Sequence, residues 1–551
     1  MRLQRRKFDM WSALTILFLG LFGLFLLYPL FGILKQSVMS DEGTFTLAQF
    51  SRFFSKPYYS RTIINSFKVT VAITLTTLLI GIPFSYFYSF YRLKGAKVLF
   101  VISVLNCMSA PFIGAYSWIL LLGRSGVITL FLKNVFNIEI GNIYGFKGIL
   151  LVQSLKLYPL VFIYMNGAFK NIDSSLMEVS ANLGCVGLKR FFRVIMGLSM
   201  PTILAASLLV FMRAFADFGT PLLIGEGYRT FPVEIYNQYL GDVGTDYNFA
   251  AAISVIAILF TAAIFFIQKW ATSKFQFSMN AMNPIEKKPA KGVRGALMYC
   301  YTYLLTAIGF LPQIYVVYLS FRNSEMVRFK EGYSLSSYRL AVDKLLVRSI
   351  NNTMILGLGA LAIIIVFSIL IAYLVVRRSN FANQAIDTFS MLPYILPGSV
   401  IGVAMVVAFS KPPIVLTGTM GIMIISFVIR RMPYSIRSAN ATLMQIPLSI
   451  EEASISLGTS KLKTFVQITV PMMGNGIVSG AILSWVAIVT ELSSSIILYN
   501  NRNITLTMST YVAISRGSYG IACVFSAVLT LLTTLSLVLY LVISKTEDIA
   551  L

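Results

Sequence analysis

Long apolar runs follow one another along almost the whole chain. The first, WSALTILFLGLFGLFLLYPLFGIL, comes directly after the basic stretch MRLQRRKFDM, and no small-residue cleavage site follows it. About 20 apolar residues in a helix span the roughly 30 Å core of a bilayer, so we expect an uncleaved first membrane helix. Of the 551 residues, 57% are hydrophobic and 12% are charged, which leaves too little polar surface for a water-soluble globule. The sequence predicts an all-α integral membrane protein whose solvent is the lipid bilayer.

Twelve apolar segments are long enough to cross a membrane. They lie at 11–33, 62–90, 97–122, 146–168, 199–216, 248–268, 295–320, 351–376, 386–409, 415–441, 473–497 and 520–543. Lys and Arg cluster in the short loops on the side of the N-terminus, and cytoplasmic loops carry such an excess. We therefore expect both termini to be cytoplasmic. The long loop at 321–350 is also basic and runs against this trend.

The chain contains a tandem duplication. Glu178 and Gly184 recur as Glu452 and Gly458, each 274 positions later. We expect two homologous halves of six helices each, joined by a polar segment that contains proline. The predicted parts are a first half at 1–275, a cytoplasmic linker at 276–294 and a second half at 295–551.

Missing residue types argue against several kinds of function. The net charge is +24, but the basic residues form short clusters beside apolar runs, so we expect no nucleic-acid partner. The sequence has no histidine and its four cysteines form no CxxC pair, so we expect no metal site. It also lacks a GxxxxGKS or GxxxxGKT phosphate-binding loop. We therefore expect a chain that is not an enzyme by itself and binds no cofactor of its own.

A polar segment, EEASISLGTSKLKTFVQITVP, interrupts the apolar pattern at 451–471. Glu452 and Ala453 are followed by Gly458 and, thirteen residues later, by Pro471. Glycine permits a tight turn between two short helices. The segment resembles the cytoplasmic coupling loop in the permeases of type I, binding-protein-dependent ABC importers.

A second such segment, MEVSANLGCVGLKRFFRVIMG, occupies the matching place in the first half, at 177–197. Glu178, Ser180 and Gly184 fit the same pattern, whereas Gly197 stands where the proline is expected. Two matching copies favour this interpretation over an amphipathic helix lying in the membrane interface.

The resemblance implies a division of labour between this chain and its partners. It implies a coupling helix near 174–190 and another near 448–464, gripped by a homodimer of ABC ATPase subunits that binds ATP and Mg. It also implies alternating access, an extracytoplasmic solute-binding protein and a place in the bacterial inner membrane. The coupling residues that it implies are Glu178, Ser180, Gly184, Glu452, Ala453 and Gly458.

The cargo expectation also comes from resemblance. Two halves fused in one chain resemble the permeases for ferric iron, thiamine, aminoethylphosphonate and sugar phosphates. The segments FADFGTPLLIGEGYRTFPVEIYNQ (215–238) and ITLTMSTYVAISRGSYGIA (504–522) look like those of fused ferric-iron permeases. Ferric iron is therefore the expected cargo, and the other three remain open.

Charged residues within the spans are the candidates for a translocation pathway, because such charges are costly in a membrane. Lys156 matches Arg430 and Asp217 matches Glu491 at the 274-residue shift, and Arg213 lies four residues before Asp217 on the same predicted helix face. One interpretation is a set of structural ion pairs, in which Arg213 pairs with Asp217. The other is a polar pathway for an anion or for a hard cation such as ferric iron.

A transporter of a different class would share several of these features. A secondary transporter driven by an ion gradient also has twelve helices, an internal repeat and charges within its spans. It would not explain the paired Glu and Gly motifs in the two polar segments.

Overall fold

The computed structural model describes residues 9–40, 42–139, 141–241, 245–274, 283 and 285–544. The elements up to residue 274 are α1 (Met10–Phe22), η1 (Gly23–Leu27), α2 (Tyr28–Ser37), α3 (Ala48–Ser55), α4 (Pro57–Phe90), β1 (Tyr91–Arg92), α5 (Ala96–Met108), α6 (Pro111–Leu122), α7 (Val127–Phe136), α8 (Phe146–Lys170), α9 (Ser174–Asn182), α10 (Gly187–Arg190), η2 (Phe191–Ile195), α11 (Met196–Leu198), α12 (Met200–Phe215), α13 (Gly219–Ile224), α14 (Phe231–Leu240) and α15 (Tyr247–Lys274). The later elements are β2 (Lys288–Pro289), α16 (Gly292–Ser320), β3 (Arg322–Glu325), β4 (Arg328–Tyr333), α17 (Ser336–Lys344), α18 (Leu346–Arg377), α19 (Phe381–Ile395), α20 (Gly398–Phe409), α21 (Met420–Gln445), α22 (Leu448–Ser456), α23 (Lys461–Thr464), η3 (Phe465–Thr469), α24 (Val470–Met472), α25 (Gly474–Val489), α26 (Ser495–Leu498), α27 (Leu506–Ser515) and α28 (Tyr519–Ser544).

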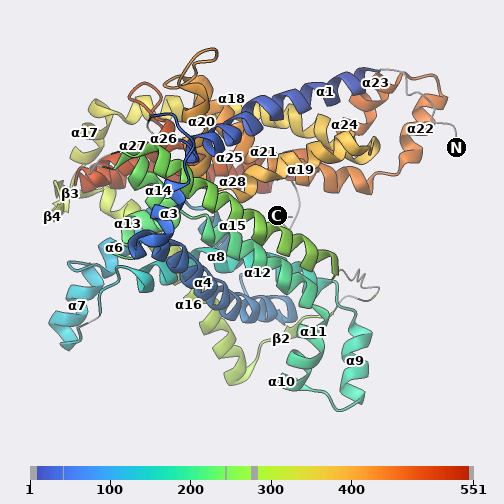
Figure 1. Cartoon of the computed structure of the whole chain (residues 1–551). Coiled ribbons are helices and arrows are strands. Elements are labelled where there is room, and N and C mark those ends of the chain that lie inside the picture. The colour runs from blue at the N-terminus through green and yellow to red at the C-terminus, as the bar shows by residue number, and fades with distance from the viewer. Residues whose placement is uncertain are drawn as a thin grey trace.

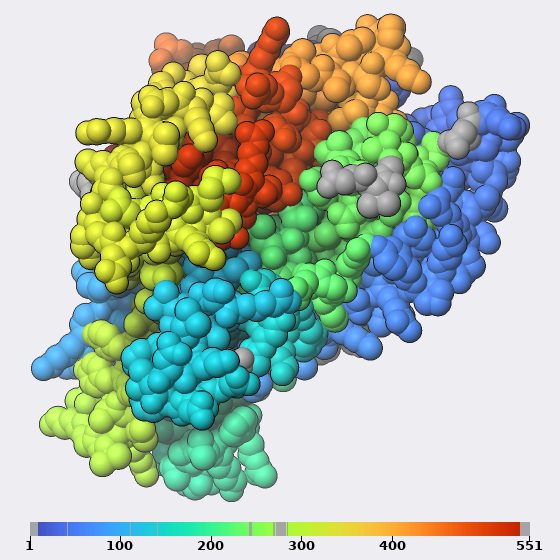
Figure 2. All heavy atoms as spheres, turned by 90° about the vertical axis from the view of Figure 1, so that its left-hand side faces the viewer, coloured from blue at the N-terminus to red at the C-terminus, as the bar shows by residue number. Residues whose placement is uncertain are grey.

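The helices extend between two ends of the molecule. In Figure 1 the short helices α9 and α22 both lie at the right-hand end, which we call the coupling end, and α7, β3 and β4 lie at the left-hand end. Figure 2 faces this opposite end, where α7 (cyan) and the segment from β3 to α17 (yellow) form much of the surface. β3 and β4 pair as an antiparallel hairpin.

The helices confirm the predicted fold class, an all-α integral membrane protein. Among the described residues, eight helices are long and apolar enough to cross a membrane, or eleven if each of three bent pairs counts as one span. All twelve predicted segments contain helices, but several differ from expectation. The segment at 386–409 bends by 111° between α19 and α20, and the segment at 473–497 leaves the helix between α25 and α26. The segment at 97–122 is broken between α5 and α6, where Ser109 and Ala110 are extended before Pro111. α21 carries three arginines, so it is more polar than the other long helices.

The first helix of each half packs against the other half. α1 runs along the second half in Figure 1, and Thr15 donates a hydrogen bond from Oγ1 to Oδ1 of Asn383 at 2.9 Å. α16 lies against the first half, where the Tyr301 hydroxyl donates to the carbonyl of Ile80 at 2.8 Å. The two predicted halves, whose limits in sequence remain predictions, are therefore interlocked in space.

Small residues let α21 and α25 approach each other closely. A Cβ atom at Gly480 would lie 2.7 Å from Cα of Ser435, and one at Gly476 would overlap the side chain of Thr442. The Ser438 hydroxyl donates to the carbonyl of Gly476 at 2.7 Å. Close contact between small residues is a main source of helix association in membranes. The contact fixes the helix that leads to Glu491 against the helix that carries Arg430.

The predicted linker at 276–294 lies partly outside the described residues. Residues 1–8 and 545–551, which are predicted to be cytoplasmic, lie wholly outside them. Where the chain is described again, the Asn283 amide donates to the carboxylate of Asp173 at 3.1 Å, and its carbonyl accepts from the Ser174 amide at 2.9 Å. β2 then pairs in parallel with β1. The end of the linker is thus attached to the first half, beside α9.

The internal repeat persists in the structure. The π-helical turns η2 and η3 begin 274 positions apart, and so do α12 and α25. Each of these long helices is preceded by a bend, of 73° before α12 and 69° before α25. The first bend forms without a proline at Gly197, the position that corresponds to Pro471.

Candidate functional site

Each predicted coupling helix is part of a short helix, a glycine turn and a second short helix; we call these the first coupling segment (174–190) and the second (448–464). The turn residues are Gly184, at φ +70°, and Gly458, at φ +86°, where glycine is favoured over residues with a Cβ atom. Their amides donate to the carbonyls of Ala181 (2.9 Å) and Ile455 (3.0 Å). The same turn is therefore built twice, and both copies lie at the coupling end (Figure 1).

The predicted coupling residues divide into an exposed set and a buried one. Glu178, Glu452 and Ala453 are exposed, as are the two turn glycines. Ser180 is buried, and its hydroxyl donates to the Met177 carbonyl at 2.8 Å, so it lies beneath the surface.

Two exposed leucines were missed by the sequence interpretation. Leu183 and Leu457 precede the turn glycines, and they are 80% and 87% exposed. Exposed apolar side chains at matching places indicate a surface for a protein partner. The signal in the sequence was the repeated pair Leu-Gly.

Glu451 is a third missed residue, and it behaves differently from its neighbour Glu452. Its carboxylate Oε1 lies 2.8 Å from Nε of Arg377, and the two side chains are 6% and 11% exposed. The Tyr373 hydroxyl donates to Oε2 at 3.3 Å. The first half has Met177 in this place, so only the second coupling segment is tied to the bundle by this ion pair.

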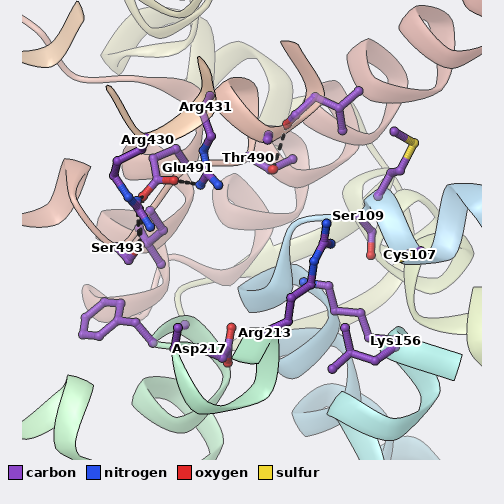
Figure 3. A pocket seen from close by; sticks show the side chains of 18 of the residues that line it. Cys107, Ser109, Lys156, Arg213, Asp217, Arg430, Arg431, Thr490, Glu491 and Ser493 are labelled. Atoms are coloured by element: carbon purple, nitrogen blue, oxygen red, sulfur yellow. Dashed lines mark hydrogen bonds and ion pairs between the residues drawn. The ribbon is translucent and has the colours of Figure 1, made fainter. Parts of the chain in front are cut away.

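All five predicted pathway residues line one cavity of about 220 Å³ between the halves. Figure 3 shows Lys156, Arg213 and Asp217 on first-half elements, facing Arg430 and Glu491 on second-half elements. Lys156 comes from α8 and Arg430 from α21, and both carboxylates follow the ends of α12 and α25. The repeat therefore places its matched charges around one space.

Glu491 is at the centre of a dense set of contacts. Its two oxygens form ion pairs with Arg430 and Arg431. Oε1 also accepts hydrogen bonds from the Ser493 hydroxyl (2.8 Å) and the Ser494 amide (3.0 Å). A buried carboxylate needs such partners, because an unpaired buried charge is costly. In the second half, the acidic and basic residues therefore form ion pairs with one another.

The first half is arranged differently, and the predicted pair of Arg213 with Asp217 is wrong. α12 ends at Phe215, so Asp217 has left the helical register that would place it one turn after Arg213. Oδ2 of Asp217 accepts from the Thr220 amide at 3.0 Å. The Arg213 guanidinium carbon lies 5.9 Å from the ring centre of Tyr434 instead.

Arg431 and Gly398 were also missed. Arg431 has no basic counterpart in the first half, where Leu157 occupies the matching position, so the repeat could not identify it. A Cβ atom at Gly398 would overlap the Ser493 hydroxyl and meet the Arg430 guanidinium. Only glycine leaves room for this cluster, and the sequence gives no signal of that long-range contact.

The described residues contain no group of three or more His, Cys, Asp or Glu side chains placed to hold a metal ion. Two tyrosines, Tyr394 and Tyr434, line the cavity with ring centres 5.4 Å apart. The site is thus a cavity between two helical halves whose charged side chains are mainly basic, without a ready cluster of metal ligands among the described residues.

Comparison with known families identifies the architecture. The family described as the inner membrane component of binding-protein-dependent transport systems matches the chain twice, at residues 81–277 and 338–546. The chain belongs to this family. It is an ABC importer permease with both halves fused in one polypeptide.

Relatives of the permease match over most of its length. It is 29% identical to the ferric transport system permease protein FbpB of Actinobacillus pleuropneumoniae over 537 residues, which is 96% of this chain and 77% of that one. It is 30% identical to FbpB 1 of Haemophilus influenzae over 509 residues, 90% of this chain and 79% of that one. A solved bacterial alginate ABC transporter in complex with its periplasmic protein aligns at a TM-score of 0.41, with 17% identity, over 48% of this chain and 95% of that one.

Proposed function

We propose that this permease imports ferric iron. An extracytoplasmic binding protein delivers the cargo, and a homodimer of ABC ATPase subunits drives transport with ATP and Mg. The chain itself supplies the pathway and the coupling segments and hydrolyses no ATP. The cargo proposal is supported by the relative named as a ferric transport permease, which matches 96% of the chain.

One observation carries the ATP-driven part of the proposal. The two coupling segments have the same glycine turn, expose a glutamate and a leucine each, and lie at the same end of the molecule (Figure 1). Two equal subunits of a motor need two equal surfaces to grip. We place this end, and with it both termini, in the cytoplasm of a bacterium.

The proposed mechanism is alternating access. After each bend, α12 and α25 run for 16 residues, about 24 Å, and end two residues before Asp217 and Glu491. A displacement of the coupling segments is passed along these helices to the cavity, because packed helices move as rigid bodies. When the motor closes, the halves rotate and the cavity opens to the binding protein; hydrolysis reverses the movement.

Uptake of radioactive ferric iron by cells tests this proposal. The exposed glutamates Glu178 and Glu452 are changed to alanine together, and Glu331→Ala at the opposite end serves as the matched control. We expect the double variant to lose most ferric uptake while the ATPase still hydrolyses ATP. The control variant should keep normal ferric uptake.

Copurification adds a second readout. Tagged permease is expected to bring an ABC ATPase with it from native membranes. Uptake that persists without ATP and stops when the ion gradient is collapsed would instead support a secondary transporter. ATP-dependent uptake of thiamine, aminoethylphosphonate or a sugar phosphate, but not of ferric iron, would contradict the proposed cargo. It would still support an ATP-driven importer.

A further inference from the structure

Charged side chains around the central cavity are mainly basic. The basic ones are Lys156, Arg213, Arg430 and Arg431, and the acidic ones are Asp217 and Glu491. With every group ionised, four basic and two acidic side chains leave a formal charge of +2. Charges at membrane depth are screened weakly, so such an excess attracts anions strongly.

The excess comes from two arginines that the internal repeat does not duplicate. The residues at the matching positions of Arg213 and Arg431 are Ala487 and Leu157. The repeat-related residues alone would contribute two basic and two acidic groups and would balance. The additional charge is therefore not a requirement of the shared fold.

Arg213 is the arginine best placed to meet a ligand. The ion pairs of the cavity join Glu491 to Arg430 and Arg431, so Arg213 has no carboxylate partner among the described residues. Its Nε is buried without a hydrogen-bond acceptor. Tyr434 supports its guanidinium from one side. Figure 3 shows the side chain on the cavity wall.

The carboxylates of the cavity are poorly placed to hold a bare ferric ion. Both oxygens of Glu491 face arginines, and Asp217 accepts from the Thr220 amide. A hard cation needs several oxygen ligands, and the described residues provide no acidic cluster for it. A trivalent cation would also be repelled by the excess positive charge.

We propose that the cavity is an oxyanion-binding site, in which Arg213, with Lys156 on the same half, holds carboxylate or phosphate groups of the cargo. This rests on the proposed import of ferric iron and specifies its form: iron crosses as a negatively charged complex with an oxyanion. A guanidinium binds carboxylate or phosphate through two parallel N–H donors. Basic side chains likewise select anions in pores.

Binding to the permease, held with its ATPase pair in lipid nanodiscs, tests the proposal. The probes are radioactive inorganic phosphate and ferric citrate labelled in both iron and citrate. We expect both to bind saturably to the wild type, and Arg213→Gln to weaken both at least tenfold. Arg213→Lys, which keeps the charge, retains more affinity than Arg213→Gln. Arg294→Gln removes the same charge from the exposed start of α16 and leaves binding unchanged.

Two further probes distinguish an oxyanion site from direct ligation of the metal. Tyr434→Phe removes a phenol oxygen but keeps the ring under Arg213, so oxyanion binding is expected to persist. Ferric acetohydroxamate, a neutral complex, is expected to bind at least tenfold more weakly than ferric citrate. The proposal is overturned if neither oxyanion binds the wild type, or if iron binding survives Arg213→Gln and is lost in Tyr434→Phe.

Uptake measurements separate this proposal from the proposed function. If Arg213→Gln leaves ferric uptake unchanged, with or without citrate, the oxyanion site is contradicted. The proposed import of ferric iron is then unaffected. Phosphate binding that depends on Arg213, in a transporter that takes up no iron in any form, removes ferric iron as cargo. The oxyanion site then remains, with a free oxyanion as its ligand.

Discussion

Neighbouring glutamates in the second coupling segment have opposite surroundings, and their variants should behave differently. Glu451→Ala leaves Arg377 buried without its partner, which costs about 3 kcal/mol in the free energy of unfolding. Glu452→Ala removes only an exposed side chain, so stability should change by less than about 0.5 kcal/mol. Denaturation in detergent measures both.

A double-mutant cycle provides the control for Glu451. When Arg377→Ala is combined with Glu451→Ala, much of the loss should be recovered, because no unpaired charge remains buried. Additive losses in the double variant would mean that the two side chains do not interact.

Gly398 permits the charge cluster around Glu491. In Gly398→Ala the new methyl group overlaps Ser493 and Arg430, so the Arg430 guanidinium must move away from its partner. We expect the free energy of unfolding to fall by about 3 kcal/mol and ferric uptake to be impaired. In Gly359→Ala on α18 the methyl group meets an Ile424 methyl at 3.6 Å, an ordinary contact, so this control should be near neutral. Equal effects of the two changes would contradict the crowding at Gly398.

The repeat in the sequence identified the cavity residues that have counterparts, namely Lys156 with Arg430 and Asp217 with Glu491. It could not identify Arg431, whose counterpart is a leucine. The pairing of Arg213 with Asp217 was predicted wrongly because α12 ends at Phe215, before a further helical turn could bring Asp217 next to Arg213.

At the scale of elements, the glycine turns should resist substitution for reasons of backbone alone. A Cβ atom at Gly184 or Gly458 meets no atom within 4 Å, but both residues have positive φ. Alanine at either position should therefore lower the free energy of unfolding by about 1 kcal/mol. Gly197 lies in a helical turn with equally open surroundings, so Gly197→Ala should raise the free energy of unfolding by about 0.5 kcal/mol. A neutral Gly458→Ala would show that the turn has another conformation in the membrane.

Spans were predictable from apolar length, but the exact form of their breaks was not. The segment at 97–122 was predicted as one span. In the structure it forms two helices, because Pro111 begins a new helix after two extended residues. The bend before α12 has no proline at the position that corresponds to Pro471, but Pro201 lies in the first turn of α12, directly after the bend.

At the scale of the whole molecule, the first helix of each half packs against the other half. We call this the exchange of first helices, and it should hold the halves together without a covalent link. A chain divided within 275–282, and expressed as two polypeptides, should copurify as one complex with nearly unchanged uptake. In Trp11→Ala the first helix loses its ring contact with Tyr373, whose ring centre is 4.4 Å away, and copurification of the two polypeptides should weaken. Phe31→Ala, an exposed position on α2, serves as control. Halves that purify separately would contradict the exchange.

This exchange could not be read from the sequence. Hydropathy predicts that a helix spans the membrane, but α1 and α16 select their neighbours through contacts hundreds of residues apart, such as Thr15 with Asn383. The duplication was predicted from sequence; the interlocking of the halves required the structure.

The most direct test of ATP-driven coupling is thiol labelling at the two exposed leucines. Leu183→Cys and Leu457→Cys are introduced after Cys185 and Cys300 have been replaced by serine, and membrane vesicles of both orientations are treated with an impermeant maleimide. Both positions should react only from the cytoplasmic side, and bound ATPase should protect both. Labelling from the outside, or reactivity that an ATPase never reduces, would contradict two cytoplasmic coupling segments driven by a separate motor.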